Sequence, residues 1–338
     1  MNYDFDTIIL GGGSVGSSIL FELSQCSKQR VALVDQGRYS AGATVHSGGM
    51  IRAFHESSDH VELALNSQKL LCEYQARGVL TEKSISCGNL YFFHKFRFSG
   101  YQQSLKMMED AAHPFEVLSP IQGKRRFPEF NWKEDEWAIY EPTATHLNPM
   151  GFCQDLITQS MQNGAKIFDH TEVTRLSRFR DQYKLFAGEK TFTCRILILA
   201  GGARMLPRLE DFGLSFPLEA RTITSYTMFK KPELNLPHFF DREKLEFGRM
   251  GLDPLMVMSD PETDRLVSRG WTKMIGKRQA QDCYAPNRVG LLGEVSGHSR
   301  LILATGWGGT AFKFSLGIGK KIAELIEETL SERKRLYV

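Results

Sequence analysis

The chain has 338 residues, of which 42 are Lys or Arg and 39 are Asp or Glu, and its net charge is +3. These values are ordinary for a soluble globular protein of one large or two interlocked domains, and they argue against a nucleic acid partner. The six cysteines are scattered and form no C-x-x-C pair, which argues against a metal site or a disulfide framework and is typical of a reducing cytosol.

No segment has the pattern of a leader or a membrane span. The first apolar run begins within a few residues of Met1, so we expect no signal or transit peptide. No uninterrupted apolar stretch approaches the length of about 20 residues that a transmembrane helix needs. We therefore expect a cytoplasmic protein without a membrane span.

The N-terminal region predicts a strand, a glycine turn, a helix and a second strand. Residues 6–10 are mostly apolar, residues 11–16 read GGGSVG, and apolar side chains then recur at helical spacing up to Gln25. Residues 31–34 are a second apolar run that ends at Asp35. Continuous apolar strands that alternate with amphipathic helices predict a parallel sheet covered on both faces.

The glycine turn has the G-x-G-x-x-G spacing of a dinucleotide site. Glycines permit a tight turn and a close approach of backbone N–H groups, and the N-terminus of the following helix attracts phosphate. Asp35 stands where a carboxylate can accept hydrogen bonds from a ribose diol. The motif predicts a bound dinucleotide, with a plain strand–helix turn as the alternative, and it does not distinguish FAD from NAD.

The rest of the chain alternates between such units and β-rich stretches. Helical spacing covers 60–78 and ends at a capping glycine, and Asn148-Pro149 opens a helix that ends near Gly164. Further strands are predicted at 90–93, 165–168, 172–176, 194–200 and 301–304. A glycine-rich turn at 306–309 precedes a long terminal helix.

Two β-rich insertions interrupt the helix–strand units, so two discontinuous domains are expected. The fold class is α/β, or α+β overall: a Rossmann-like cofactor domain with a discontinuous, mostly antiparallel β substrate domain. Residues 1–80, 143–212 and 285–338 are assigned to the first domain, and residues 81–142 and 213–284 to the second.

The end of the chain carries a family resemblance. Residues 304–319, ATGWGGTAFKFSLGIG, resemble the C-terminal flavin loop of the D-amino acid oxidase superfamily, which includes sarcosine oxidase, glycine oxidase and dimethylglycine dehydrogenase. The glycine turn, Asp35, residues 42–52, residues 146–149 and residues 200–202 follow in the order and spacing of that group, so the resemblance covers nearly the whole chain. It implies that the cofactor is FAD and that the protein is an FAD-dependent oxidoreductase.

The resemblance also implies which residues contact FAD. Val173 would contact adenine through its backbone, and the last loop would stabilise the negative charge of a reduced flavin near N1 and the C2 carbonyl. The implied contacts are Gly11, Gly13, Ser14, Val15, Gly16, Asp35, Gln36, Ala43, Thr44, His46, Ser47, Gly48, Val173, Ala200, Gly201, Gly202, Gly306, Gly308, Gly309, Thr310, Ala311, Phe312 and Lys313.

His46 falls on a histidine that is bonded covalently to the flavin in the dimethylglycine and sarcosine dehydrogenases. The resemblance therefore implies either a covalent FAD or, as in many relatives, an unlinked FAD with His46 beside the ring. Sarcosine oxidase uses a late cysteine instead, and Cys283 lies near that region but out of register.

Four residues are candidates for catalysis: Arg52, His46, Lys313 and Tyr91. Arg52 matches an arginine near the substrate carboxylate in sarcosine oxidase-like members, and a guanidinium suits that group. Lys313 would assist the flavin loop, while Tyr91, with His55, is a candidate for the pocket wall. The plainer alternatives are an arginine paired with a surface acid and a surface helix lysine. His146 is interpreted as a turn residue.

The chain departs from the family before its last strand. Residues 268–275 run within a few positions into residues 282–286, where relatives carry a helical segment that covers the flavin and builds the pocket. The family's threonine-proline-aspartate-glycine signature is replaced by residues 285–288, APNR. A shorter segment predicts a more open pocket.

The leading functional prediction is oxidation of a C–N bond in a small amine or amino acid with a carboxylate, by hydride transfer to flavin N5. Two alternatives are a flavoenzyme that modifies a peptide, a partner protein or a biosynthetic intermediate, and a 2-hydroxy acid dehydrogenase. The last alternative is a non-catalytic FAD-binding scaffold.

Overall fold

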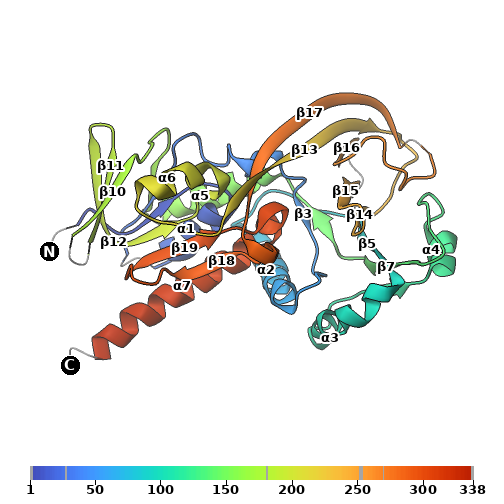
Figure 1. The fold of residues 1–338 in the computed structure, drawn as a ribbon, viewed down its shortest axis with the longest axis horizontal. Coiled ribbons are helices and arrows are strands. Elements are labelled where there is room, and N and C mark those ends of the chain that lie inside the picture. The colour runs from blue at the N-terminus through green and yellow to red at the C-terminus, as the bar shows by residue number, and fades with distance from the viewer. Residues whose placement is uncertain (1–2, 27–28, 180–181, 251–253, 269, 336–338) are drawn as a thin grey trace.

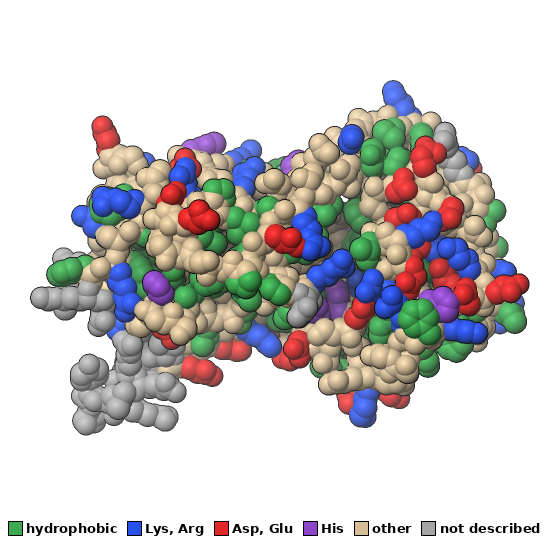
Figure 2. Space-filling view, viewed as in Figure 1, with side chains coloured by type: hydrophobic (Ala, Val, Ile, Leu, Met, Phe, Trp, Pro, Cys, Tyr) green, Lys and Arg blue, Asp and Glu red, His purple; other side chains and the backbone are tan. Residues whose placement is uncertain are grey.

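A computed structural model describes residues 3–26, 29–179, 182–250, 254–268 and 270–335 of the chain (Figure 1). The chain forms two large sheets, one small sheet and the helices that cover them. The space-filling view shows two lobes, and Lys and Arg side chains gather where the lobes meet (Figure 2). Among the described residues, no helix combines the length and the apolarity needed to cross a bilayer.

The first sheet has eight strands in the order β10-β11-β12-β1-β2-β9, with β19 beside β12 and β18 beside β19. The strands span Phe5–Leu10 (β1), Val31–Val34 (β2), Lys166–Phe168 (β9), Arg175–Phe179 (β10), Gln182–Ala187 (β11), Lys190–Leu199 (β12), Leu291–Glu294 (β18) and Leu301–Thr305 (β19). Its centre is parallel: β1 pairs with β2 and β12, and β12 pairs with β19. The buried apolar strands of this centre match the sequence pattern that predicted it.

Four helices pack against one another beside this sheet: α1 (Ser14–Ser24), α2 (Ser58–Ala76), α5 (Pro149–Gln162) and α7 (Ala311–Arg335). Gly317 donates its backbone N–H to Ser67 Oγ of α2 at 2.9 Å. A Cβ atom on Gly319 would lie 2.8 Å from the backbone of Ser18 in α1. The two glycines therefore let α7 lie directly against both helices.

The second sheet has eight strands in the order β17-β13-β16-β15-β14-β5-β7-β6. The strands span Asn89–His94 (β5), Glu116–Leu118 (β6), Glu136–Glu141 (β7), Glu219–Lys230 (β13), His238–Asp241 (β14), Glu246–Arg249 (β15), Leu255–Met258 (β16) and Trp271–Tyr284 (β17). Only β14 and β5 pair in parallel within it. Arg265 is buried in its core, where it pairs with Glu136 and Asp241 and lies over the Phe92 ring.

Smaller elements connect the two sheets. The third sheet consists of β3 (Met50–Ile51), β8 (Thr145–His146) and β4 (Ile85–Ser86). The remaining helices are η1 (Ala43–His46), η2 (Lys95–Tyr101), α3 (Gln102–Asp110), α4 (Pro120–Arg126), η3 (Gly202–Met205), α6 (Leu206–Asp211), η4 (Pro286–Arg288) and η5 (Gly308–Thr310).

The predicted mixture of a Rossmann-like sheet and an antiparallel sheet is present. The strands of the first sheet all fall within the predicted cofactor domain, residues 1–80, 143–212 and 285–338. Those of the second sheet fall within the predicted substrate domain, residues 81–142 and 213–284. The domain boundaries themselves stay a prediction. Strand β17 runs without a break from Trp271 to Tyr284, so in this described stretch residues 275 and 282 are joined without the helical segment that relatives were expected to carry.

Candidate cofactor and substrate site

The glycine turn lies where the ends of β1 and β12 meet. Gly11 has φ +106°, and a Cβ atom on it would lie 2.5 Å from the Cα of Gly201. Ala200 donates its N–H to the carbonyl of Leu10 at 2.8 Å, which holds the two strand ends together. The carboxyl ends of parallel strands are where open α/β sheets bind ligands.

Asp35 organises this turn through its carboxylate. Its Oδ2 accepts the N–H of Gly12 at 2.6 Å and its Oδ1 accepts the N–H of Gly37 at 2.8 Å. Burial raises the pKa of Asp35, and these two N–H donors oppose that effect. Thr44 Oγ1 accepts the N–H of Ser14, the first residue of α1, at 3.1 Å. Residues 43–46 are thereby held against the turn, as the predicted cofactor contacts require.

An open pocket lies at this edge of the sheet. Among the predicted residues it is lined by Gly11, Asp35, Gln36, Val173 and Gly201. Its glycine-and-aspartate rim at the carboxyl ends of parallel strands fits the adenosine half of a dinucleotide.

Arg204 and Arg208 also line this pocket, and neither was predicted from the sequence. Arg204 donates to the carbonyl of Ala41 at 2.9 Å, and Arg208 pairs with Glu172 at 2.7 Å. The signal that could have found them is two arginines four residues apart directly after the Gly201-Gly202 turn.

His46 ends η1, and η1, η3 and η5 all contact the long strand β17. The Nδ1 atom of His46 is buried without a hydrogen-bond partner. Burial lowers the pKa of His46, and the charges of Arg278 and Arg204 lower it further, so the imidazole is neutral. An unpartnered buried nitrogen at this place fits contact with a flavin.

The last glycine loop packs beneath the end of β17. Gly306 and Gly308 both have positive φ, and the ring of Tyr284 lies directly over Gly308. Asp282 Oδ2 lies 3.5 Å from the position that a Cβ atom of Gly309 would take, and burial raises the pKa of Asp282 to about 6. The sequence did not single out Asp282. Cys283, the alternative attachment residue, hydrogen-bonds with Thr305 instead.

Arg52 is buried, with 5% of its surface exposed, and it forms no ion pair with any described residue, so the alternative of an arginine paired with a surface acid is wrong. Its guanidinium lies 5.0 Å from the Tyr91 ring centre and 5.6 Å from that of Phe240, and it donates to the carbonyl of Phe54. The hydroxyl of Tyr91 donates to Glu56 Oε1 at 2.6 Å. Tyr91 therefore supports Arg52 with its ring while its hydroxyl is bound elsewhere.

Lys313 is also buried, with 7% exposed, so the alternative of a surface lysine is wrong as well. It lies in the first turn of α7, where the helix dipole disfavours a cation. Burial lowers the pKa of Lys313 well below the ordinary lysine value, and the charge of Arg52 adds to this effect. The structure thus groups Lys313 with Arg52, and its predicted contact with the flavin stays a prediction.

Two histidines flank this pair of cations. The rings of His55 and His60 lie 4.7 Å and 5.0 Å from that of Phe314. Burial lowers the pKa of both histidines, so they are neutral at physiological pH, and the Nε2 atom of each is buried without a partner. Among the described residues neither Arg52 nor Lys313 forms an ion pair with a carboxylate, so the group presents two cations without a bound acid.

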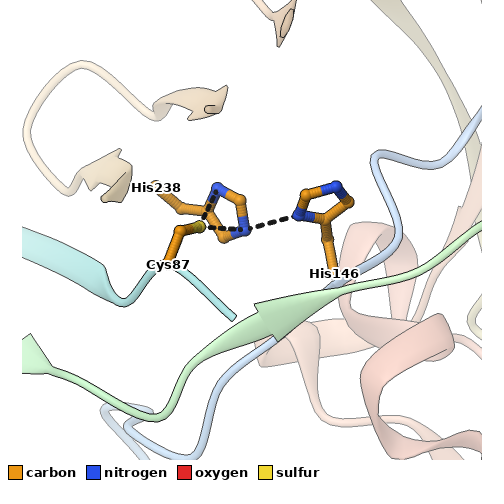
Figure 3. Close-up of side chains that lie close together, drawn as sticks. All are labelled: Cys87, His146 and His238. Carbon is orange, nitrogen blue, oxygen red and sulfur yellow. Dashed lines mark hydrogen bonds between the residues drawn. The ribbon is translucent and has the colours of Figure 1, made fainter. Parts of the chain in front are cut away.

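Cys87, His146 and His238 also meet in the interior (Figure 3). His146 Nδ1 lies 3.2 Å from His238 Nε2, and Cys87 Sγ lies 3.2 Å and 3.5 Å from the two ring nitrogens of His238. Rather than the turn residue that was expected, His146 is a buried member of β8.

The hydrogen bonds of His238 argue against a metal ion in this cluster. Its Nδ1 accepts the N–H of Met250 at 2.9 Å, so in the neutral ring Nε2 carries the hydrogen. A histidine that binds a metal through one nitrogen donates a hydrogen from the other, which the Met250 N–H prevents here. Cys87 Sγ is nearly equidistant from both nitrogens and so lies over the ring, away from the lone-pair direction of Nε2.

The sequence matches one known family over most of its length. Residues 6–250 match the family model described as FAD dependent oxidoreductase. The monomeric sarcosine oxidase of Streptomyces avermitilis is 26% identical over 225 residues, which cover 66% of this chain and 58% of that protein. The monomeric sarcosine oxidase of a Bacillus species, strain B-0618, is 23% identical over 96% of this chain and 93% of its own. The human mitochondrial sarcosine dehydrogenase is matched over only 28% of its length.

Solved structures share the fold over almost the whole chain. Glycine oxidase from Geobacillus kaustophilus superimposes with a TM-score of 0.80 at 19% identity and covers 97% of this chain and 95% of its own. L-proline dehydrogenase from P. horikoshii superimposes with a TM-score of 0.84 at 15% identity, with the same coverage. The predicted fold class and family resemblance are therefore confirmed.

Proposed function

Because the chain belongs to the FAD dependent oxidoreductase family, we propose that it oxidises a C–N bond in a small amine or amino acid that carries a carboxylate. One observation carries this proposal: the buried side chains of Arg52, directly after β3, and of Lys313, in the first turn of α7, interact electrostatically, and β3 and α7 contact each other. Two desolvated cations beside a helix N-terminus form a site for one small anion.

The residues present fit FAD. The pocket at Gly11, Asp35, Val173 and Gly201 would hold the adenosine part, and the turn before α1 would hold the pyrophosphate. Beyond the turn, η1 and η5 both contact β17, and η5 directly precedes the helix that carries Lys313. FAD supplies the oxidation itself, because its N5 can accept a hydride.

The protein's own contribution is to bind and orient the substrate. Arg52 would take the carboxylate with its planar guanidinium, and Lys313 would add a second charge from α7. The rings of Tyr91 and Phe240 fix the direction of Arg52. His55, His60 and Phe314 exclude water beside the site, which strengthens the charge interactions within it.

His46 would either bond to the flavin or lie beside it. Its unpartnered Nδ1 atom and its neutral imidazole support the covalent alternative. Acid precipitation of the yellow protein tests this point. For a covalent link we expect the yellow colour of wild type to stay with the precipitate and that of His46→Ala to appear in the supernatant. Yellow supernatant from wild type would contradict the link.

One set of assays tests the proposed function. Purified yellow protein is mixed without oxygen with amino acids, N-methyl amino acids and the corresponding amides, and loss of the flavin colour is recorded. We expect bleaching by one class of amino carboxylate, no bleaching by its amide, and loss of bleaching in Arg52→Met. Bleaching by amides as readily as by acids would contradict the role of the cation pair, and no bleaching by any of them would contradict a small substrate.

The same assays include the alternative substrates. A 2-hydroxy acid offers the same carboxylate to Arg52 and Lys313, so bleaching by hydroxy acids alone would identify the protein as a dehydrogenase of that class. The short η4 connection favours a more open mouth, which supports a peptide or other bulky substrate if every small acid fails.

A further inference from the structure

Glu141 is the last residue of β7 and has no exposed surface. Its Oε2 accepts the N–H of Ala53 at 2.7 Å and its Oε1 accepts the N–H of Phe54 at 2.9 Å. His113 Nε2 lies 3.2 Å from Oε2. A buried carboxylate that accepts two backbone N–H groups fixes the position of that backbone, because losing either acceptor leaves a buried donor unsatisfied.

The backbone of Ala53 and Phe54, which donates to Glu141, also binds the side chain of Arg52. The guanidinium of Arg52 donates to the carbonyl of Phe54, whose N–H is given to Glu141. The contacts therefore run from the carboxylate of β7, through the turn of residues 52–54, to the guanidinium. A shift of this turn would move the carbonyl acceptor and with it the direction of Arg52.

Glu141 is also the acid whose charge acts on both cations of the site. Burial lowers the pKa of Arg52 and of Lys313, and the negative charge of Glu141 acts against this by raising both. The other acid that acts on Arg52 is Glu56, which is paired with Arg242 and with the hydroxyl of Tyr91. Arg52, Glu141, His55 and His60 are the charged or titratable groups that interact with Lys313.

We propose that Glu141 is a positioning residue of the carboxylate site: it orients Arg52 through the Ala53–Phe54 turn and supplies the fixed negative charge that lets Arg52 and Lys313 share one buried site. This inference rests on the proposed function, since it assumes that the two cations bind the carboxylate of the substrate. It assigns Glu141 no contact with the substrate and no part in the oxidation.

The test measures binding without turnover. Propionate is added to the FAD-loaded protein, and the dissociation constant is obtained from the change in flavin absorption, with propionamide as the neutral probe. Glu141→Gln keeps the size of the side chain but has one acceptor for two N–H groups. We expect it to weaken propionate binding by about tenfold or more. Glu141→Asp, which keeps the charge, should recover part of the loss.

The matched control is Glu136→Gln, on the same strand. Glu136 is also buried but pairs with Arg265 in the core of the second sheet, so the loss of its charge should lower stability without changing the carboxylate site. We expect the dissociation constant of this variant to stay within about twofold of wild type. Propionate binding weakens with rising pH as Lys313 loses its proton, and the midpoint should move to lower pH in Glu141→Gln and stay unchanged in Glu136→Gln.

The outcomes separate the two proposals. If wild type binds propionate and Arg52→Met does not, while Glu141→Gln keeps the wild-type constant and midpoint, the role of Glu141 is wrong and the carboxylate site stands. If wild type shows no preference for propionate over propionamide, both are wrong. Should Glu141→Gln fail to accumulate as folded protein, a wild-type constant in Glu141→Asp would overturn the inference.

Discussion

The backbone of Gly11 lies against that of Gly201, so that a Cβ atom on Gly11 would be 2.5 Å from the Cα of Gly201. The contact joins a residue at the start of the chain to one almost two hundred positions later, at the edge where the pocket opens. Any side chain at residue 11 would push the two strand ends apart. The same position also has φ +106°, which disfavours every residue except glycine.

We therefore expect Gly11→Ala to lose FAD. The added methyl group would displace the turn that we propose to hold the pyrophosphate, and the purified variant should be colourless. The matched control is Gly78→Ala, which has φ +70° and open space around the added atom. It carries the same kind of backbone strain but should stay yellow, and equal flavin content in the two variants would contradict this reasoning.

Lys313→Met is expected to stabilise the ligand-free protein and to abolish its stabilisation by propionate. Methionine fills the same space without a buried charge, and we expect a gain of about 1 kcal/mol or more in the free energy of unfolding at neutral pH. Thermal unfolding with and without propionate measures both effects. Lys321→Met on the same helix, where the lysine is half-exposed and paired with Glu62, should show neither.

The pH dependence of stability provides a second test of Lys313. The pKa of Lys313 is lowered in the folded protein, so above that value the unfolded chain binds one proton more than the folded chain does. The free energy of unfolding should therefore rise with pH between the folded value and about 10.4, the ordinary lysine value. Lys313→Met should lack this rise, and an unchanged slope would show that Lys313 keeps its proton without a ligand.

Asp282→Asn should change the flavin's reduction potential in a pH-dependent way. Burial raises the pKa of Asp282 to about 6, so a negative charge stands beside the flavin loop at pH 7.5 and is absent at pH 5. Removing that charge favours the negatively charged reduced flavin, and the potential of the variant should be higher than wild type at pH 7.5. Equilibration with a reference dye measures it, and equal differences at both pH values would contradict the assignment.

The raised pKa of Asp282 also has a consequence for stability. Between about 3.9 and about 6 the folded protein holds a proton that the unfolded chain has released, so stability from this group falls as pH rises through that window. Asp282→Asn should therefore flatten the stability profile in the same window. Denaturant unfolding at a series of pH values provides the measurement.

Chelators should leave the protein unchanged. The Nδ1 of His238 faces the N–H of Met250, so the Cys87–His146–His238 cluster does not offer the lone pair that a metal needs. We expect no metal retained in proportion to protein, and the same melting temperature before and after EDTA. A metal bound at one equivalent in wild type and lost in Cys87→Ser would show that the cluster rearranges to bind it.

The sequence predicted features that depend on neighbouring residues. The glycine turn, the acid at Asp35 and the apolar strands around them are local patterns, and the parallel centre of the first sheet follows from their alternation. The family resemblance extended this to FAD and to the pairing of the first and last glycine loops. Arg52 and Lys313 were found in the same way, although their burial beside each other was not foreseen.

The residues that sequence reasoning missed act through distant contacts. Glu141 is an isolated acid until Ala53 and Phe54, almost ninety positions earlier, donate to it. Asp282 alternates with Cys283 along one strand, and only the packing of η5 shows which of the two faces the flavin loop. The partners of His238 come from three separate segments of the chain. No local periodicity carries such information, because each contact is made by the fold as a whole.

The packing of α7 against α1 and α2 has a consequence for biosynthesis. Gly317 and Gly319 join the last helix to helices that leave the ribosome hundreds of residues earlier, and the same helix carries Lys313. Until residues 301–319 are synthesised, β12 lacks its neighbour β19, and the parts of α1 and α2 that pack against α7 stay uncovered. That apolar surface therefore stays exposed on the nascent chain until the first turns of α7 have been synthesised.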